Sequence, residues 1–365
     1  MKYDENGSMH AFRRRRRPPP LVAFLHKHTA YDLLPVSVKV VVLDTLLPLR
    51  KAIAALLLNG LTAAPLWHSP TMSFFGLLTV ADILRLVLHY ADSLAALPET
   101  EPASLADDID AITVESLRSY AFAPAPTPAS SASVAASTST PPVVGLNPLK
   151  IHPLRSVLEA SQTMAQCHLH HLPLVDVDSV NKQETVVSVL SGSKILRFLA
   201  CNCPSIRNLT MPLPPTLGTS SPHLLTATPS TPLLDAIRLM ANHDISALPI
   251  IDPHTNTLLD VFSETDVLLT VRDFPTVPMW TPLGEALGRR PPESPLSSAV
   301  YTCQRTDTVA SLFAIIQQGA KVTRFMVVDA EGRLEGVVTL GDLLGWVLAY
   351  VPEAPDVQES FGAGS

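Results

Sequence analysis

Residues 324–342 read RFMVVDAEGRLEGVVTLGD, and this stretch decides the fold. Two apolar runs flank a turn rich in charge and glycine, which predicts two strands joined as a hairpin. The stretch closes on Thr339 and Asp342, a hydroxyl and a carboxylate spaced as at the start of a helix. An amphipathic helical pattern at 309–317 precedes it. The predicted unit therefore contains a helix, two strands and a second helix.

The same order occurs three more times upstream. The first helix and first strand of each copy are predicted at 49–58 and 63–67, 154–165 and 171–176, 233–241 and 247–252, and 309–317 and 324–329. The second strand and its polar end follow at 76–82, 187–194, 260–266 and 336–342. If Pro65, Pro173, Pro249 and Met326 are equivalent, the copies lie 108, 76 and 77 residues apart. We predict an α/β (α+β) fold of four βαββα repeats.

Composition narrows the class of protein. Charged residues make up 16% of the 365, against about 25% in typical soluble chains. The most apolar stretch, 33–66, is interrupted by charges, so no membrane span is expected. Net charge is −7 although Arg13–Arg17 supply five positive charges, and an acidic body does not favour nucleic acid as a partner. No secretory signal is predicted, and the four cysteines are expected to be reduced.

Low-complexity segments set the predicted boundaries. Between residues 121 and 142, 20 of 22 residues are Ala, Pro, Ser or Thr, which predicts a disordered loop, preceded by a short helix at 109–120. The predicted division is a disordered arm (1–20), repeat one (21–97), a linker (98–148), repeat two (149–204), repeat three (205–274), repeat four (275–350) and a disordered tail (351–365). The arginine run predicts either a nuclear-import or anionic-surface patch or a solvated charge run.

The repeats resemble cystathionine-β-synthase (CBS) modules, and four in tandem resemble the γ subunits of AMP-activated and sucrose-nonfermenting protein kinases. The similarity covers roughly residues 21–350. The sequence motifs that carry this resemblance most specifically are YDLLP at 31–35, NG at 59–60, APLW at 64–67, VSVLS at 187–191, KILRF at 194–198, and EAL at 285–287 followed by Arg289-Arg290.

The resemblance implies repeats paired head to tail into two modules that form a flat disc with up to four clefts. It implies a non-catalytic regulatory subunit that binds AMP, ADP or ATP as regulatory ligands, with no other cofactor, and has a kinase catalytic α subunit and a scaffold β subunit as partners. We expect it in the cytoplasm and nucleus. Two alternatives stay open: a constitutive structural subunit with vestigial clefts, and a CBS regulator of another enzyme or channel.

Ribose recognition needs an acceptor for two adjacent hydroxyls, and a carboxylate at a helix start can accept both. The matching positions are Asp82, Asp266 and Asp342, each three residues after a hydroxyl, at Thr79, Ser263 and Thr339. Lys194 takes the fourth position and can only donate, so that cleft is expected to be empty. The same aspartates are also ordinary helix-capping residues.

Phosphate needs positive charge or oriented donors. The resemblance places such groups just before each strand proline, here at Thr62/Ala63, His170/His171, Ser246/Ala247 and Thr323/Arg324. Animal members would carry Arg at position 62, His-Arg at 170–171 and His at 323, so this chain is poorer in fixed charge. We rank first the cleft of Asp342, Ser246, Thr231 and Arg324, and expect Arg290 near the phosphates.

The sequence CHLHH at 167–171 raises the possibility of a zinc site. On a strand, alternate residues face opposite ways, which leaves only two ligands on each face. We therefore expect phosphate-facing or solvated histidines and no metal. The sequence also lacks a Walker-type phosphate loop, a kinase signature and a nucleophile elbow, so no catalytic residues are predicted.

Overall fold

The computed structural model describes residues 20–37, 39–95, 112–117, 149–220, 224–272, 278–290, 300–319 and 321–350. Four predictions lie outside these residues: the arm up to residue 19 with its arginine run, the Ala/Pro/Ser/Thr loop, the 351–365 tail and most of the linker. Within the described chain, no helix has the length and apolarity needed to cross a bilayer.

All four repeats form the predicted helix, hairpin and second helix. Repeat one contains α2 (Leu49–Asn59), β2 (Ala63–His68), β3 (Ser73–Thr79) and α3 (Val80–Ala95). Repeat two contains α6 (Val157–Gln166), β4 (His171–Val177), β5 (Glu184–Ser191) and α7 (Gly192–Asn202). Repeat three contains α8 (Leu233–Asn242), β7 (Ala247–Ile251), β8 (Leu258–Ser263) and α9 (Glu264–Arg272). Repeat four contains α11 (Val309–Gln317), β10 (Arg324–Val328), β11 (Leu334–Thr339) and α12 (Leu340–Ala349).

The leading strand of each unit is very short. In repeats one and four it is β1 (Leu43–Asp44) and β9 (Thr302–Cys303), each parallel to the first strand of the hairpin. In repeats two and three it shrinks to single parallel bridges, Ile151 with Leu174 and Ala227 with Ile250. The predicted βαββα order is thus present four times.

Strand register places polar groups at one end of every hairpin. The first residue of the first strand pairs with the hydroxyl residue that ends the second: Ala63 with Thr79, His171 with Ser191, Ala247 with Ser263 and Arg324 with Thr339. Because the second helix begins immediately after that hydroxyl, its free N–H groups meet the start of the hairpin. Each repeat therefore presents its polar positions at one corner.

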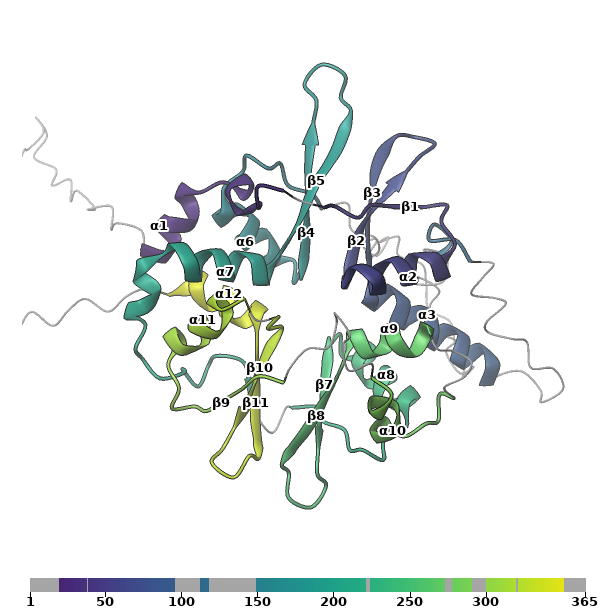
Figure 1. The fold of residues 1–365 in the computed structure, drawn as a ribbon, viewed down its shortest axis with the longest axis vertical. Coiled ribbons are helices and arrows are strands. Elements are labelled where there is room, and N and C mark those ends of the chain that lie inside the picture. Colours follow the sequence, from purple (N-terminus) through teal and green to yellow (C-terminus); the bar gives the residue numbers. More distant parts are fainter. Residues whose placement is uncertain are drawn as a thin grey trace, which may run out of the picture.

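The buried core connects repeats that are not neighbours in sequence. One apolar cluster joins the helices of repeats one and three, and a second joins those of repeats two and four. Hairpins of consecutive repeats lie beside each other, with β5 against β2 and β3, and with Thr257 bridged to Arg333. Figure 1 shows the result: a disc with repeats one and two along one edge and repeats three and four along the opposite edge.

Three segments differ from the predicted division. The helix α1 (Pro20–Lys27), assigned by sequence order to repeat one, packs on α6 and α12, because Leu21 and Leu25 complete the core of repeats two and four. Strand β6 (Thr219–Ser220), assigned to repeat three, pairs with β11 of repeat four. Of the helix predicted at 109–120, residues 112–116 form a bridge to Pro48 and a turn, Leu117 is helical, and 109–111 and 118–120 lie outside the described residues.

Three smaller elements complete the part of the chain that the structure describes. They are the 3₁₀ helices η1 (Ala30–Leu33) and η2 (Pro204–Asn208) and the short α10 (Leu283–Gly288). The η1 turn is closed by Thr29 and Asp32, whose carboxylate accepts from the Thr29 backbone and hydroxyl. This hydrogen bonding accounts for the aspartate of the YDLLP motif.

Candidate functional site

The three predicted aspartates share one geometry at the start of the second helix. In each, Oδ2 accepts hydrogen bonds from the backbone N–H and the hydroxyl of the residue three positions earlier. The distances are 2.9 and 2.7 Å from Thr79 to Asp82, 2.8 and 2.8 Å from Ser263 to Asp266, and 2.8 and 2.7 Å from Thr339 to Asp342. This is a capping role, and it uses only one carboxylate oxygen.

The contacts of the second carboxylate oxygen, Oδ1, differ among the three aspartates. Oδ1 of Asp342 has no hydrogen-bond partner within the described chain. Oδ1 of Asp82 lies 3.5 Å from Arg85, and burial raises the pKa of this carboxyl despite the bonds from Thr79. Oδ1 of Asp266 is bound directly by Arg290. Asp342 therefore has the most acceptor capacity left for a ligand hydroxyl.

Arg290 fills the corner of repeat three. Its Nε and Nη2 donate to the two oxygens of Asp266 at 2.6 and 2.9 Å, and its Nη1 donates to Asp260 at 3.0 Å. Nη2 also donates to the carbonyl of Val261 at 2.6 Å. The remaining cavity is about 20 Å³, room for a water molecule. The prediction that Arg290 lies near the phosphates of a bound nucleotide stays a prediction; in this structure its guanidinium binds the two aspartates.

At the fourth corner Lys194 stands in place of the aspartate. Its ammonium donates to the carbonyl of Val189 at 2.6 Å, and burial lowers its pKa. The helix start is capped by Ser191 alone, which accepts from the Lys194 backbone at 3.4 Å. A ribose diol at this corner would meet a donor rather than a carboxylate.

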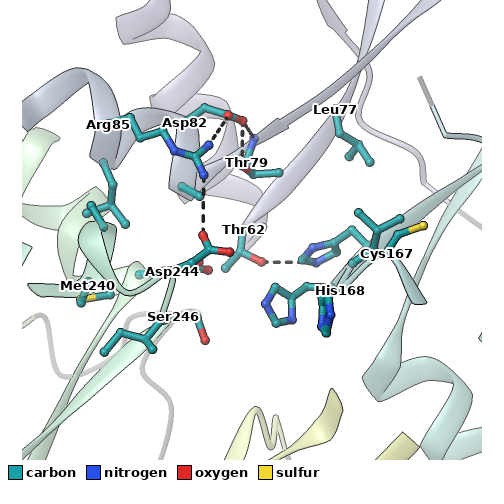
Figure 2. A pocket seen from close by; sticks show the side chains of 18 residues that line it. Thr62, Leu77, Thr79, Asp82, Arg85, Cys167, His168, Met240, Asp244 and Ser246 are labelled. Carbon is teal, nitrogen blue, oxygen red and sulfur yellow. Dashed lines mark hydrogen bonds and ion pairs between the residues drawn. The ribbon is translucent and has the colours of Figure 1, made fainter. Parts of the chain in front are cut away.

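The first central cavity, of about 280 Å³, lies among repeats one, two and three. Its polar lining consists of Thr62, Thr79, Asp82, Arg85, His168, His170, His171, Asp244, Ser246 and Glu264. Figure 2 shows Arg85 between Asp82 and Asp244, which it contacts at 3.5 and 3.6 Å. The one arginine on this wall is thus already facing two carboxylates.

The second central cavity, of about 200 Å³, adjoins the first. It is lined by the beginnings of three helices, at 191–193 of α7, 263–265 of α9 and 339–341 of α12, together with Thr323 and Arg324. Helix starts present free N–H groups and partial positive charge, which suits a phosphate. Arg324 donates to the hydroxyl of Ser246 at 3.3 Å. Burial lowers its pKa to about 10, so it is charged at neutral pH.

The histidines do not lie as the strand argument assumed. Cys167 ends α6, His168 adopts a left-handed φ of 51°, and the strand begins only at His171. Within the described residues, no group of three His, Cys, Asp or Glu side chains is arranged to hold a metal. Burial lowers the pKa of His171 to about 4 and, with Arg324, lowers that of His170. Both rings are therefore neutral at pH 7 and act as polar groups, with His171 3.4 Å from the Thr62 hydroxyl.

Most predicted site residues gather at these two cavities. The residues that line one or both are Thr79, Asp82, His170, His171, Ser246, Ser263, Arg324 and Thr339. Asp342 lies one hydrogen bond away through Thr339. Asp266 and Arg290 close their own corner, and Thr231 closes a turn with Thr228 without lining either cavity.

Glu264 lines both cavities and is absent from the predicted site. It is the first residue of α9, where burial raises its pKa to about 7 while Arg324 opposes that shift. The sequence contains a signal for it. The residue after the capping hydroxyl is Val80, Gly192, Glu264 or Leu340 in the four repeats, so the charge occurs once.

Comparison with known proteins agrees with this architecture. The CBS domain family model matches residues 219–287 and 296–349, within repeats three and four. The 5'-AMP-activated protein kinase subunit gamma of Kluyveromyces lactis is 32% identical over 329 residues, covering 89% of this chain and 90% of that protein. The chain belongs to the AMP-activated protein kinase gamma subunit family. The gamma subunit of Saccharomyces cerevisiae is similar to the same degree, 32% identical with 89% and 91% covered.

Gamma-subunit architecture also appears in a solved structure of low identity. Protein MJ1225 of Methanocaldococcus jannaschii has a TM-score of 0.62 at 16% identity, covering 87% of this chain and 99% of that one. This likeness concerns the fold alone. It confirms the predicted fold class, and the relatives confirm the predicted family.

Proposed function

We propose that this chain is the non-catalytic regulatory subunit of a heterotrimeric protein kinase and binds AMP, ADP or ATP in its central cavities. The kinase catalytic α subunit and a scaffold β subunit are its partners. The observation that carries this proposal is the second central cavity, where Arg324 and three helix starts lie beside Asp342 with its available oxygen.

The chemistry of an adenine nucleotide matches that arrangement. A ribose has two adjacent hydroxyl donors, which an aspartate oxygen accepts, and its phosphate needs a cation and N–H donors. Arg324 supplies a charge that persists at neutral pH, and α7, α9 and α12 supply free N–H groups. The neutral histidines and Ser246 add uncharged hydrogen-bonding groups.

A bound ligand can change how the four repeats are placed relative to one another, because every repeat contributes residues to the cavity walls. Ser246 of repeat three bonds Arg324 of repeat four, and Thr62 of repeat one lies against His171 of repeat two. A ligand that binds one relative placement of these repeats better than another shifts the equilibrium between them, typically by about 1–3 kcal/mol.

Calorimetric titration of the full chain with AMP and ATP tests the binding half of the proposal. We expect saturable heat at micromolar to millimolar ligand, and its absence would overturn nucleotide binding. The partner half is tested by affinity purification from cells, which should recover a protein kinase catalytic subunit. Recovery of a different enzyme or a channel in its place would favour the general CBS-regulator alternative.

A constitutive structural subunit is the second candidate, and specific observations favour it. Arg290 closes one corner, Lys194 removes the acceptor from another, and Thr62 and Thr323 are uncharged where animal members carry basic residues. Kinase assays across AMP:ATP ratios separate the candidates, because a purely structural subunit supports assembly without any nucleotide response.

Residence in both cytoplasm and nucleus is a further part of the proposal, motivated by the arginine run at 13–17. Replacement of the five arginines by alanine should then reduce the nuclear fraction of a fluorescently tagged chain. An unchanged distribution would assign the run to a solvated arm.

A further inference from the structure

Glu264 stands at the junction of the two central cavities. It is the first residue of α9, and it lines both the 280 Å³ and the 200 Å³ cavity. Its backbone N–H donates to the carbonyl of Ser246 at 3.1 Å, while the hydroxyl of the same serine accepts from Arg324 at 3.3 Å. Ser246 therefore binds both the backbone of Glu264 and the guanidinium of Arg324, and brings the two residues to the same point of the cavity wall.

An acid in the first turn of a helix is common, because it complements the helix dipole. The first-turn Glu159 of α6 is an example whose side chain is 47% exposed and faces Arg155. Glu264 differs because its side chain faces the cavities that hold the phosphate-binding groups. Helix stabilisation alone does not require a carboxylate there, since repeats one, two and four have uncharged residues at the same place.

The charges around Glu264 come from every neighbouring element. The charged and titratable groups are Asp82 and Arg85 of α3, His168 and His170 between α6 and β4, His171 of β4, Asp244 before β7, and Arg324 of β10. Arg324 attracts the carboxylate, whereas Asp82 and Asp244 repel it. A bound phosphate would compete with Glu264 for Arg324 and would add to the negative charge that already surrounds it.

We propose that Glu264 limits the phosphate charge that the central cavities accept, so that a nucleoside monophosphate binds in preference to a triphosphate. This rests on the proposed function. A monophosphate brings about two negative charges, which Arg324 and the helix starts can balance. Each further phosphate places more negative charge within the same cavities as Glu264, Asp82 and Asp244, and like charges repel strongly in a partly desolvated site.

The limit depends on pH because Glu264 titrates near neutrality. Its pKa of about 7 means that it is largely ionised at pH 8 and largely neutral at pH 6. His171, with a pKa of about 4, stays neutral over this range, and Arg324, with a pKa of about 10, stays charged. Triphosphate affinity should therefore rise as pH falls from 8 to 6. Protonation of the phosphate also raises the affinity at low pH, but it does so equally in the wild type and in a variant that lacks the Glu264 carboxylate.

The experiment compares the full-length wild type with Glu264→Gln, using Glu159→Gln as the matched first-turn control. Isothermal titrations in metal-free buffer, where ATP keeps its full charge, use AMP, ATP and inorganic tripolyphosphate at pH 8 and pH 6. At pH 8 we expect E264Q to gain about tenfold in affinity for ATP and tripolyphosphate and less than about threefold for AMP. At pH 6 the gain should shrink, and E159Q should match the wild type throughout.

The outcomes separate the two proposals. Equal gains for AMP and ATP, or no gain, would overturn the role of Glu264 while leaving nucleotide binding intact. A gain for tripolyphosphate without binding of either nucleotide would support the charge limit and overturn the proposed function. Absence of binding by all three ligands in both proteins would overturn both. If E264Q does not fold, Glu264→Ala removes the same charge and should give the same gain.

Discussion

The guanidinium of Arg290 binds the carboxylate of Asp266 side on, with Nε 2.6 Å from Oδ1 and Nη2 2.9 Å from Oδ2. The aspartate side chain is 9% exposed and that of the arginine 26%. Burial opposes the charge of Arg290, but the bonds to Asp266 and Asp260 outweigh this and raise its pKa. Arg290 thus binds both oxygens of the Asp266 carboxylate, whereas the equivalent carboxylates of repeats one and four, Asp82 and Asp342, are more available to a ligand.

Replacing Arg290 by alanine should destabilise the chain by about 1–3 kcal/mol, because two carboxylates lose their partner and one of them is buried. The free energy of unfolding in urea measures this. Arg289→Ala is the neighbouring control, since its exposed pair with Glu285 is worth less than about 1 kcal/mol. Equal losses in the two variants would contradict a special role for Arg290.

Nucleotide affinity should depend most on Asp342. Asp342→Asn keeps the size of the side chain but halves its acceptor capacity, so AMP affinity should fall about tenfold. Asp266→Asn should leave AMP affinity nearly unchanged, because that carboxylate is occupied by Arg290. Calorimetry measures both, with the unfolding midpoint as a check on folding. A larger loss in Asp82→Asn than in Asp342→Asn would reverse the ranking of the clefts.

Stability should depend on pH through Glu264. Its pKa is about 7 in the folded chain against about 4.3 in an unfolded one. Because the folded value is raised, its contribution to stability is fully present below pH 4.3 and is lost as pH rises through 7. The stability of E264Q relative to wild type should therefore increase between pH 5 and pH 8. Parallel stability curves for the two proteins would disprove this linkage, and E159Q should show such parallel behaviour.

Lys194 can be used to test the capping role of the aspartates. Lys194→Asp recreates at α7 the hydroxyl and carboxylate pair of Thr79 and Asp82, and removes a positive charge from a helix start. We expect a gain of about 0.5–1 kcal/mol in unfolding free energy. Lys194→Gln removes the lysine without adding a carboxylate. If the two variants are equally stable, the carboxylate contributes nothing as a cap.

Sequence patterns predicted the elements well because each repeat is locally consistent. The helix predicted at 309–317 coincides with α11, and the four hairpins begin at the predicted residues. Apolar periodicity and helix-capping hydroxyls are local signals, and they act within about ten residues. The same locality explains why Asp82, Asp266 and Asp342 were found.

Interactions between repeats were not predictable from these patterns. Arg324 reaches Ser246 across 78 positions, and only the family resemblance had placed the two in one cleft. Arg85 reaches Asp244 across a still larger separation, a contact that was not predicted. Arg290 was predicted near phosphates from the family resemblance, and its contact with Asp266 depends on how the chain after α10 packs beside repeat three, which local patterns do not show. His168 was wrongly placed on a strand. It has a left-handed backbone conformation just after α6, and a histidine predicts that conformation less strongly than a glycine does.

The two shared cores also affect how the chain is made. A ribosome releases repeats one and two first, when the apolar helix faces that will meet repeats three and four have no cover. In solenoid arrays each unit contacts only its neighbours, and folding can spread step by step. Here neither half of the chain contains a complete core. The core of repeats one and three is complete once α10 has been synthesised, whereas the core of repeats two and four also needs α12, so the disc closes only after α12 has been synthesised.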